Sequence, residues 1–175
     1  RATAEHTLLL TLALMRKLVP AVETTSQKSW DREQFRGREI YKKTIGIIGY
    51  GRLGQIIEEY FICLGARVIV YEKYPNSELR KSSKLVTLDR LLEQSDIVSL
   101  HINYSPENIK YITSKHFSKM KSTGLFINSS RGQVVDGYAL VEALKSGEIS
   151  GAALDVIFDE VNLDKSPELK YFVDC

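Results

Sequence analysis

The stretch Thr44-Ile-Gly-Ile-Ile-Gly-Tyr-Gly-Arg-Leu-Gly-Gln-Ile-Ile57 decides the fold of this chain. Its β-branched first half is typical of a strand that is buried on both faces of a parallel sheet. Three glycines follow at G-x-G-x-x-G spacing: Gly49 permits a tight turn, Gly51 lets the backbone approach a pyrophosphate, and Gly54 lets a helix pack close to the strand. The helix that begins there would point free N–H groups at the phosphates, so the spacing predicts a dinucleotide site.

The sequence after the glycines strengthens this prediction, because a lone glycine motif also occurs in turns that bind nothing. Residues 52–64 are compatible with a helix, Gly65 suits its C-terminus, and residues 66–71 form a second apolar run. Glu72 ends that run, 18 residues after Gly54, where an acid accepts hydrogen bonds from ribose hydroxyls. Its charge should repel a 2′-phosphate and favour NAD over NADP. A methyltransferase-like domain is disfavoured, since an adenosyl cofactor has no pyrophosphate.

Composition sets the remaining bounds. The chain has 175 residues, 43% of them hydrophobic, which suffices for one domain with a substantial core, and its net charge of +2 indicates neither a nucleic-acid nor a membrane surface. Cys63 is expected to be a core thiol and Cys175 a terminal one, with no disulfide framework and no metal spacing. The apolar run 8–15 is too short to span a bilayer. We therefore expect a cytoplasmic protein, and the opening at Arg1 in a helical pattern predicts part of a longer one.

Helices and strands alternate along the chain, which predicts an α/β fold with a doubly wound parallel sheet, of the Rossmann type, after an apolar N-terminal helix. That helix is expected over 2–19, and a polar connection over 23–43 in which Trp30 and Phe35 pack on the helix. The basic residues Arg80, Lys81 and Lys84 are expected to form a solvated face. Further strands are predicted at 96–101, 124–128 and 149–156, and helices after the capping residues Thr87, Thr113 and Asp136.

Ligands of such sheets bind beyond the carboxyl ends of the strands. Arg131 lies there and could hold a small carboxylate in a bidentate pair, although a salt bridge to Asp136 explains it equally well. Glu160 could act as a general base or the partner of one, or be a solvated loop carboxylate. Asp155 could accept the carboxamide of a nicotinamide ring or cap the next turn.

Three blocks of sequence resemble the NAD-binding domain of the D-isomer-specific 2-hydroxyacid dehydrogenases. They are the glycine stretch, Asn128-Ser-Ser-Arg-Gly-Gln-Val-Val-Asp136 and Gly151-Ala-Ala-Leu-Asp-Val156. Residues 2–6 and 95–101 also match, so the similarity covers nearly the whole chain. It implies one NAD-binding domain over 1–175, with most of the substrate domain absent from these residues.

The resemblance also implies roles for single residues. Arg131 matches the arginine that grips the 2-oxo acid, and Glu160 matches the glutamate that raises the pKa of the catalytic histidine, with Asp159 as the fallback. The cofactor would contact a set of positions along the sheet edge: Gly49, Gly51, Arg52, Leu53, Gly54, Glu72, Ile102, Asn103, Ser129 and Asp155.

The family's catalytic histidine lies in a Pro-His segment that these residues do not contain, and none of His6, His101 and His116 replaces it. The resemblance therefore implies an NAD-dependent oxidoreductase that transfers a hydride between nicotinamide and a D-2-hydroxy or 2-oxo acid, with this part alone inactive. The alternative is an NAD-sensing protein similar to the corepressors of this fold. A homodimer through this domain is expected, with the apolar first helix as a candidate contact, and the substrate's side chain stays open.

Overall fold

In the computed structural model, which describes residues 1–28, 30, 32–80 and 84–174, a single parallel sheet forms the centre of the fold. Its strands are β1 (Thr44–Ile48), β2 (Arg67–Tyr71), β3 (Ile97–Leu100), β4 (Leu125–Asn128) and β5 (Gly151–Leu154), in the spatial order β2-β1-β3-β4-β5. The chain thus turns from one side of β1 to the other between β2 and β3. This confirms the predicted doubly wound fold, and it places the change of direction at the end of β1.

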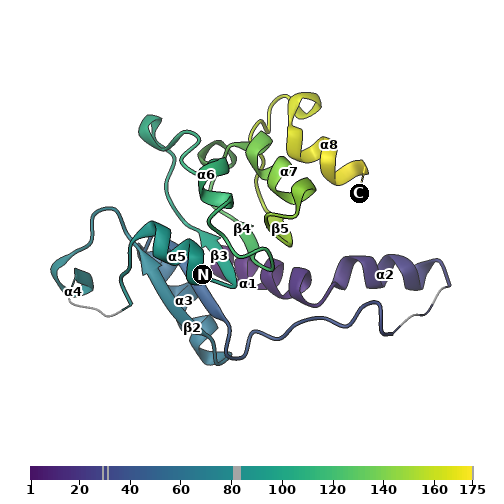
Figure 1. The fold of residues 1–175 in the computed structure, drawn as a ribbon, viewed down its shortest axis with the longest axis horizontal. Helices are drawn as coiled ribbons and strands as arrows, with labels where there is room; N and C mark the ends of the chain where they lie inside the picture. The colour runs from purple at the N-terminus through teal and green to yellow at the C-terminus, as the bar shows by residue number, and fades with distance from the viewer. Residues whose placement is uncertain (29, 31, 81–83, 175) are drawn as a thin grey trace.

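Helices cover both faces of this sheet (Figure 1). On one face, α1 (Ala2–Met15) and α3 (Arg52–Cys63) pack around Ile45, Ile47 and Phe61. On the other face, α5 (Leu88–Gln94), α6 (Ser114–Phe117) and α7 (Gly137–Ser146) pack around a second apolar cluster. The central strands β1, β3 and β4 are buried almost throughout, as their apolar character predicts, whereas β5 at one margin of the sheet is only partly buried.

The remaining helices lie outside these layers. They are α2 (Leu18–Ser26), α4 (Ser77–Arg80), α8 (Pro167–Asp174) and the short 3₁₀ turns η1 (Pro106–Asn108), η2 (Gly132–Val134) and η3 (Leu163–Lys165). α2 extends away from the sheet alongside the connection that leads to β1 (Figure 1). Among the described helices, none combines the length and the apolar character that crossing a membrane requires.

The predicted first helix is wrong at its C-terminal end. It breaks at Arg16 and Lys17, where Lys17 adopts a left-handed φ of 52°, and a second helix starts at Leu18. Pro20 lies in the first turn of that second helix, a position that proline tolerates because the N–H there has no helical partner. The change in direction leaves Leu18, Val19 and Val22 exposed.

Three single-residue predictions are also wrong, and two lie outside the described residues. Trp30 is 80% exposed instead of packing on the first helix, and Cys63 is exposed on the outer face of α3. Lys84 belongs to no solvated face, because its ammonium group binds the buried carboxylate of Glu58 at 2.7 Å. Lys81 and Cys175 lie outside the residues that the structure describes.

Several predicted helix ends are confirmed. Thr87 accepts a hydrogen bond from the Arg90 N–H at 3.3 Å, and Asp136 accepts one from the Ala139 N–H at 3.5 Å. Gly65, predicted at the C-terminus of its helix, follows α3 with a φ of 77°, a conformation that favours glycine, and Gly147 follows α7 in the same way with a φ of 74°.

Candidate functional site: the carboxyl edge of the sheet

The five strands end in one row. Pairing aligns Tyr71 with Ile48, Ile48 with Leu100, Leu100 with Asn128, and Asn128 with Leu154. The residue that follows each strand is therefore part of one continuous edge: Glu72, Gly49, His101, Ser129 and Asp155. Sequence reasoning predicts which residues end strands, and the register brings them together.

The glycine turn lies between the ends of β2 and β3 on this edge, where the strand order reverses. Gly49 has a φ of 91°, and a methyl group added there would lie 2.5 Å from the backbone oxygen of His101. The turn after β1 thus touches the end of β3. Gly51 is different, because a methyl group added there would meet no atom within 4 Å. It is the N-cap of α3 and supplies no side-chain cap, so the space beside it leaves room for a phosphate at the N-terminus of the helix.

Glu72 is held beside the glycine turn. Its carboxylate accepts hydrogen bonds from the backbone N–H of Tyr50 at 2.8 Å and of Tyr74 at 3.2 Å. Each carboxylate oxygen carries two lone pairs, so both oxygens can still accept from ribose hydroxyls. The side chain predicted to read the ribose therefore also fixes the position of the turn.

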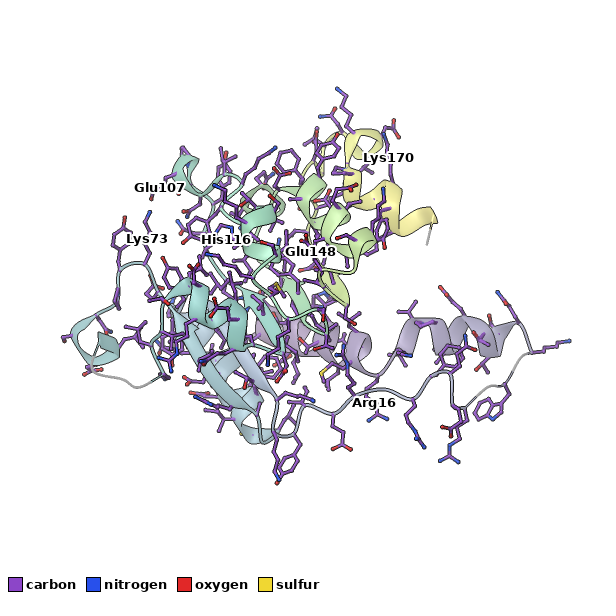
Figure 2. The ribbon with its side chains drawn as sticks, in the orientation of Figure 1. Arg16, Lys73, Glu107, His116, Glu148 and Lys170 are labelled. Atoms are coloured by element: carbon purple, nitrogen blue, oxygen red, sulfur yellow. The ribbon has the colours of Figure 1, made fainter. Side chains whose placement is uncertain are left out.

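Two cavities flank Glu72. One of 110 Å³ lies toward β3 and is lined by Gly49, Glu72, Ile102 and Asn103 among others. Lys73 and Glu107, from the connections after β2 and β3, form an ion pair of 3.4 Å at its edge (Figure 2). The other cavity, of 520 Å³, lies toward α3 and is lined by residues that include Gly51, Glu72, Glu78 and Lys84.

A cluster of polar side chains that sequence reasoning missed, Tyr50, Glu58 and Lys84, lies beside the glycine turn. The ammonium group of Lys84 lies 2.8 and 2.7 Å from the two oxygens of Glu58 and 2.5 Å from the hydroxyl of Tyr50, which also bonds to Glu58. Burial and the bond to Glu58 raise the pKa of Tyr50. Burial acts to lower the pKa of Lys84, but its bonds to Glu58 and Tyr50 outweigh this and raise it.

His101 is also part of the edge. Its Nε2 lies 2.7 Å from the Ser99 hydroxyl, whereas its Nδ1 is buried and has no hydrogen-bond partner among the described residues. Burial lowers the pKa of His101 to about 4, so the ring is neutral at pH 7. A neutral ring adds no positive charge beside the glycine turn, where the N-terminus of α3 and the side chain of Arg52 are positive.

At the end of β4, a local hydrogen-bond network shapes the turn that carries Arg131. The side-chain oxygen of Asn128 accepts bonds from the Ser130 N–H and hydroxyl, and its amide donates to the Arg131 backbone oxygen at 3.2 Å. The Arg131 guanidinium is exposed and donates to the Ser130 backbone oxygen at 2.7 Å. The alternative pair with Asp136 is wrong, because Asp136 caps α7 and pairs with Lys110 at 3.3 Å.

Helix α1 reaches the same edge from the other end of the sequence. The Thr7 and Ser129 hydroxyls lie 2.7 Å apart and are buried, and His6 Nε2 lies 3.2 Å from the Asp155 carboxylate. Sequence reasoning assigned no role in the site to either α1 residue, although the match of residues 2–6 to the family pattern was a signal.

Glu160 is exposed in the connection after β5, while the neighbouring Asp159 already accepts hydrogen bonds from Asn162. Those bonds lower the pKa of Asp159, although it is an exposed group. Of these two carboxylates, Glu160 is thus the more available to pair with a residue from another part of the intact protein. Within the described residues, no group of three or more His, Cys, Asp or Glu side chains lies close enough to hold a metal ion.

Comparison with known proteins agrees with this geometry. The family model described as D-isomer specific 2-hydroxyacid dehydrogenase, NAD binding domain, matches residues 8–172. This chain belongs to that family. As an NAD-binding domain it contains the glycine turn, the five strand ends and the Arg131 turn within the matched range.

Relatives of the domain are similar in sequence and in structure. A D-3-phosphoglycerate dehydrogenase of Synechocystis is 37% identical over 91% of the chain, and a glyoxylate reductase of Thermococcus gammatolerans is 37% identical over 91%. The chain spans only 29% and 50% of their lengths. A D-lactate dehydrogenase of Aquifex aeolicus, solved with NAD and lactic acid, superposes over 99% of the chain and 52% of its own with a TM-score of 0.83 at 34% identity.

Proposed function

We propose that the domain binds NAD(H) along its strand-end edge and that the intact protein transfers a hydride between the nicotinamide and a D-2-hydroxy or 2-oxo acid. The observation that carries this proposal is the row of strand ends, in which Glu72, the glycine turn, Ser129 and Asp155 follow one another across the reversal point. Bound NAD supplies the hydride donor or acceptor.

Different residues of the edge would contact different parts of the cofactor. Gly51, Arg52 and Leu53 would hold the pyrophosphate at the N-terminus of α3, and Glu72 the adenosine ribose. Ile102 and Asn103 would line the cofactor crevice from β3, and Ser129 and Asp155 the nicotinamide end.

NAD is favoured over NADP because the surroundings of Glu72 are poor in available positive charge. Glu72 and Glu78 both line the larger cavity. Lys84 also lines it, but its ammonium group is bound to Glu58. Lys73, next to Glu72, pairs with Glu107. A 2′-phosphate would therefore meet carboxylates and lysines that are already paired, which costs binding free energy.

In the proposed mechanism, Arg131 holds the substrate carboxylate with paired N–H donors and orients the carbonyl for transfer. Glu160 would pair with a catalytic histidine supplied from outside these residues and raise its pKa, so that the ring can donate or accept the hydroxyl proton. The exposed guanidinium and the exposed carboxylate are both accessible for these roles. We further propose that the family's Pro-His segment supplies this histidine in the intact protein, and that a separate substrate domain supplies the side-chain selectivity.

We also propose a homodimer. The support is apolar: Leu18, Val19 and Val22 are exposed on α2, which extends away from the sheet (Figure 1). Leu18 and Val19 belong to the predicted first helix, 2–19, that was expected as the contact, whereas its α1 part packs against β4 and β5 in the same chain. Light scattering that finds a monomer would contradict this proposal.

The first test is calorimetric titration with NADH and, separately, NADPH. We expect NADH to bind and NADPH to bind much more weakly; failure of both would refute the proposed cofactor site. Steady-state kinetics of the intact protein on a panel of 2-oxo acids then tests the reaction. Absence of turnover, together with NADH-dependent capture of a partner, would favour the NAD-sensing alternative.

A further inference from the structure

The two loops that carry Arg131 and Glu160 touch each other through their backbones. Gly132 follows Arg131 directly, and a methyl group added to it would lie 1.6 Å from the backbone oxygen of Ile157 and 2.8 Å from the Phe158 nitrogen. Only a residue without Cβ allows this approach. The connection after β5 therefore lies directly on the turn after β4, and its position sets where Glu160 lies relative to Arg131.

A buried carboxylate holds that connection in place. Glu168, near the start of α8, is only 2% exposed. Its Oε1 accepts a hydrogen bond from the Phe158 N–H at 3.1 Å, and its Oε2 accepts one from the Ser166 hydroxyl at 2.9 Å. Among the described residues it forms no ion pair, and its hydrogen-bond partners are these N–H and O–H donors.

The same carboxylate lies against the first residue of α7. A methyl group added to Gly137 would lie 2.3 Å from Oε1 and 2.7 Å from Oε2 of Glu168. The N-terminus of α7 carries a partial positive charge, which favours a carboxylate beside it. Glu168 thus links α7, α8 and the connection at Phe158, and all of these contacts depend on the position of its carboxylate.

We propose that Glu168 is a positioning residue that fixes Glu160 relative to Arg131. This rests on the proposed function, in which both residues act on the substrate side of the cofactor. Glu160 is exposed and lies two residues from Phe158, so the backbone determines the location of its carboxylate. An apolar side chain would fill the buried position of Glu168 but would leave the Phe158 N–H without its acceptor.

Replacement of Glu168 should therefore act through Glu160. Displacement of a catalytic group by about 1 Å can cost on the order of 100-fold in rate. If Glu160 raises the pKa of the catalytic histidine, its displacement lowers that pKa. In the reduction direction the histidine acts as an acid, so the decline of kcat/KM at high pH should begin at a lower pH.

The test uses the intact protein with NADH and whichever of glyoxylate, pyruvate and 3-phosphohydroxypyruvate it reduces fastest. We expect Glu168→Leu to lower kcat/KM about 10- to 100-fold, to leave the NADH Kd within about twofold, and to shift the pH profile in the same direction as Glu160→Gln. Glu168→Gln keeps an acceptor for Phe158 and should recover most of the activity and the profile. Glu142→Gln, an exposed change of the same kind on α7, is the matched control and should change neither.

A second variant covers the case in which Glu168→Leu does not fold. Gly137→Ala keeps the carboxylate but places a methyl group where it lies, and should shift the pH profile in the same direction by a smaller amount. The double variant Glu160→Gln/Glu168→Leu should be no slower than the slower single variant, because both changes act on one group. An unmoved pH profile in Glu168→Leu and Gly137→Ala would overturn the inference, as would a Gln variant as impaired as the Leu variant.

Amide hydrogen exchange at Phe158 separates failure of this inference from failure of the proposed function. Faster exchange in Glu168→Leu, with no effect of Glu160→Gln on the pH profile, would refute the role proposed for Glu160 and support the anchoring of the connection by Glu168. Unchanged exchange at Phe158 in Glu168→Leu would overturn the inference itself.

Discussion

Gly51 and Gly54 belong to the same motif, and the structure predicts that alanine at each has the opposite effect. A methyl group at Gly51 meets nothing within 4 Å, whereas one at Gly54 would lie 2.6 Å from the backbone oxygen of Gly49 and 3.3 Å from a methyl of Ile47. We therefore expect Gly51→Ala to fold like the parent chain and lose cofactor binding. Gly54→Ala should lose stability first.

The expected magnitudes follow from these contacts. At Gly51, the N-cap of α3 with a φ of −79°, alanine loses about 1 kcal/mol as a cap and regains about 0.4–1 kcal/mol through the lower entropy of the unfolded chain, so the two nearly cancel. At Gly54 the obstacle is backbone, and overpacking of this kind costs about 1–3 kcal/mol. For a domain of this size that is roughly 2–4 °C in Tm for each kcal/mol.

Binding should show the reverse order. The methyl group of Gly51→Ala would occupy the approach of the pyrophosphate and weaken one or two charge-assisted hydrogen bonds, at about 1.5–3 kcal/mol each. A loss of about 2–4 kcal/mol raises the NADH Kd roughly 30- to 700-fold. Thermal unfolding without cofactor and calorimetric titration with NADH measure the two quantities. Wild-type NADH affinity in Gly51→Ala, or a fall in its Tm as large as that of Gly54→Ala, would refute the reasoning.

Three further outcomes are expected. His101 is protonated near its ordinary pKa of 6.5 in the unfolded chain but only near pH 4 in the native state, so the free energy of unfolding should drop by about 3 kcal/mol as the pH falls from 6.5 to 4. Urea unfolding at several pH values should show a flatter dependence of this free energy on pH for His101→Asn. An unchanged dependence would contradict this. Lys84→Met leaves the buried Glu58 carboxylate without its cation and should cost about 1–3 kcal/mol by thermal unfolding, whereas Lys84→Met/Glu58→Leu should recover part of that loss. Arg131→Gln should reduce kcat/KM of the intact protein by about 100-fold or more with little change in the NADH Kd. Arg131→Lys should recover little of the lost kcat/KM, because an ammonium group cannot form the bidentate pair. Equal losses in kcat/KM and in NADH affinity would argue against substrate binding by Arg131.

The glycine motif and the apolar runs were enough to predict the layers of the fold and roughly where each strand ends, although the predicted strands 96–101 and 149–156 extend beyond the observed ends at Leu100 and Leu154. Both signals are local, since a strand buried on both faces must be apolar throughout and must end at a turn. The alignment of Tyr71, Ile48, Leu100, Asn128 and Leu154 in one row depends on register, which the sequence does not encode in any single segment.

The wrong predictions have two physical causes: a partner that is distant in sequence, and a local backbone conformation that the pattern does not indicate. Lys84 reads as a surface lysine until Glu58, 26 residues earlier, is brought beneath the glycine turn. Trp30 and the exposed residues of α2 follow from the left-handed conformation of Lys17, which redirects the chain away from the sheet. Nothing in the local pattern favours that conformation at a lysine, whose side chain disfavours positive φ.

One half of the carboxyl edge is held by contacts between neighbouring turns, and the other half by contacts with α1. Substitutions should therefore be able to affect cofactor binding and catalysis separately. The side proposed to hold adenosine consists of β1, β2, β3 and the turns that follow them, and Glu72 joins two of those turns through the Tyr50 and Tyr74 amides. The side proposed to hold nicotinamide depends on long-range contacts, since Ser129 is bonded to Thr7 and Asp155 lies beside His6 from the start of the chain. Changes at His6 or Thr7 should therefore disturb the proposed nicotinamide end first, because these side chains contact Asp155 and Ser129, whereas the apolar residues of α1 pack in the same cluster as Leu53 of α3.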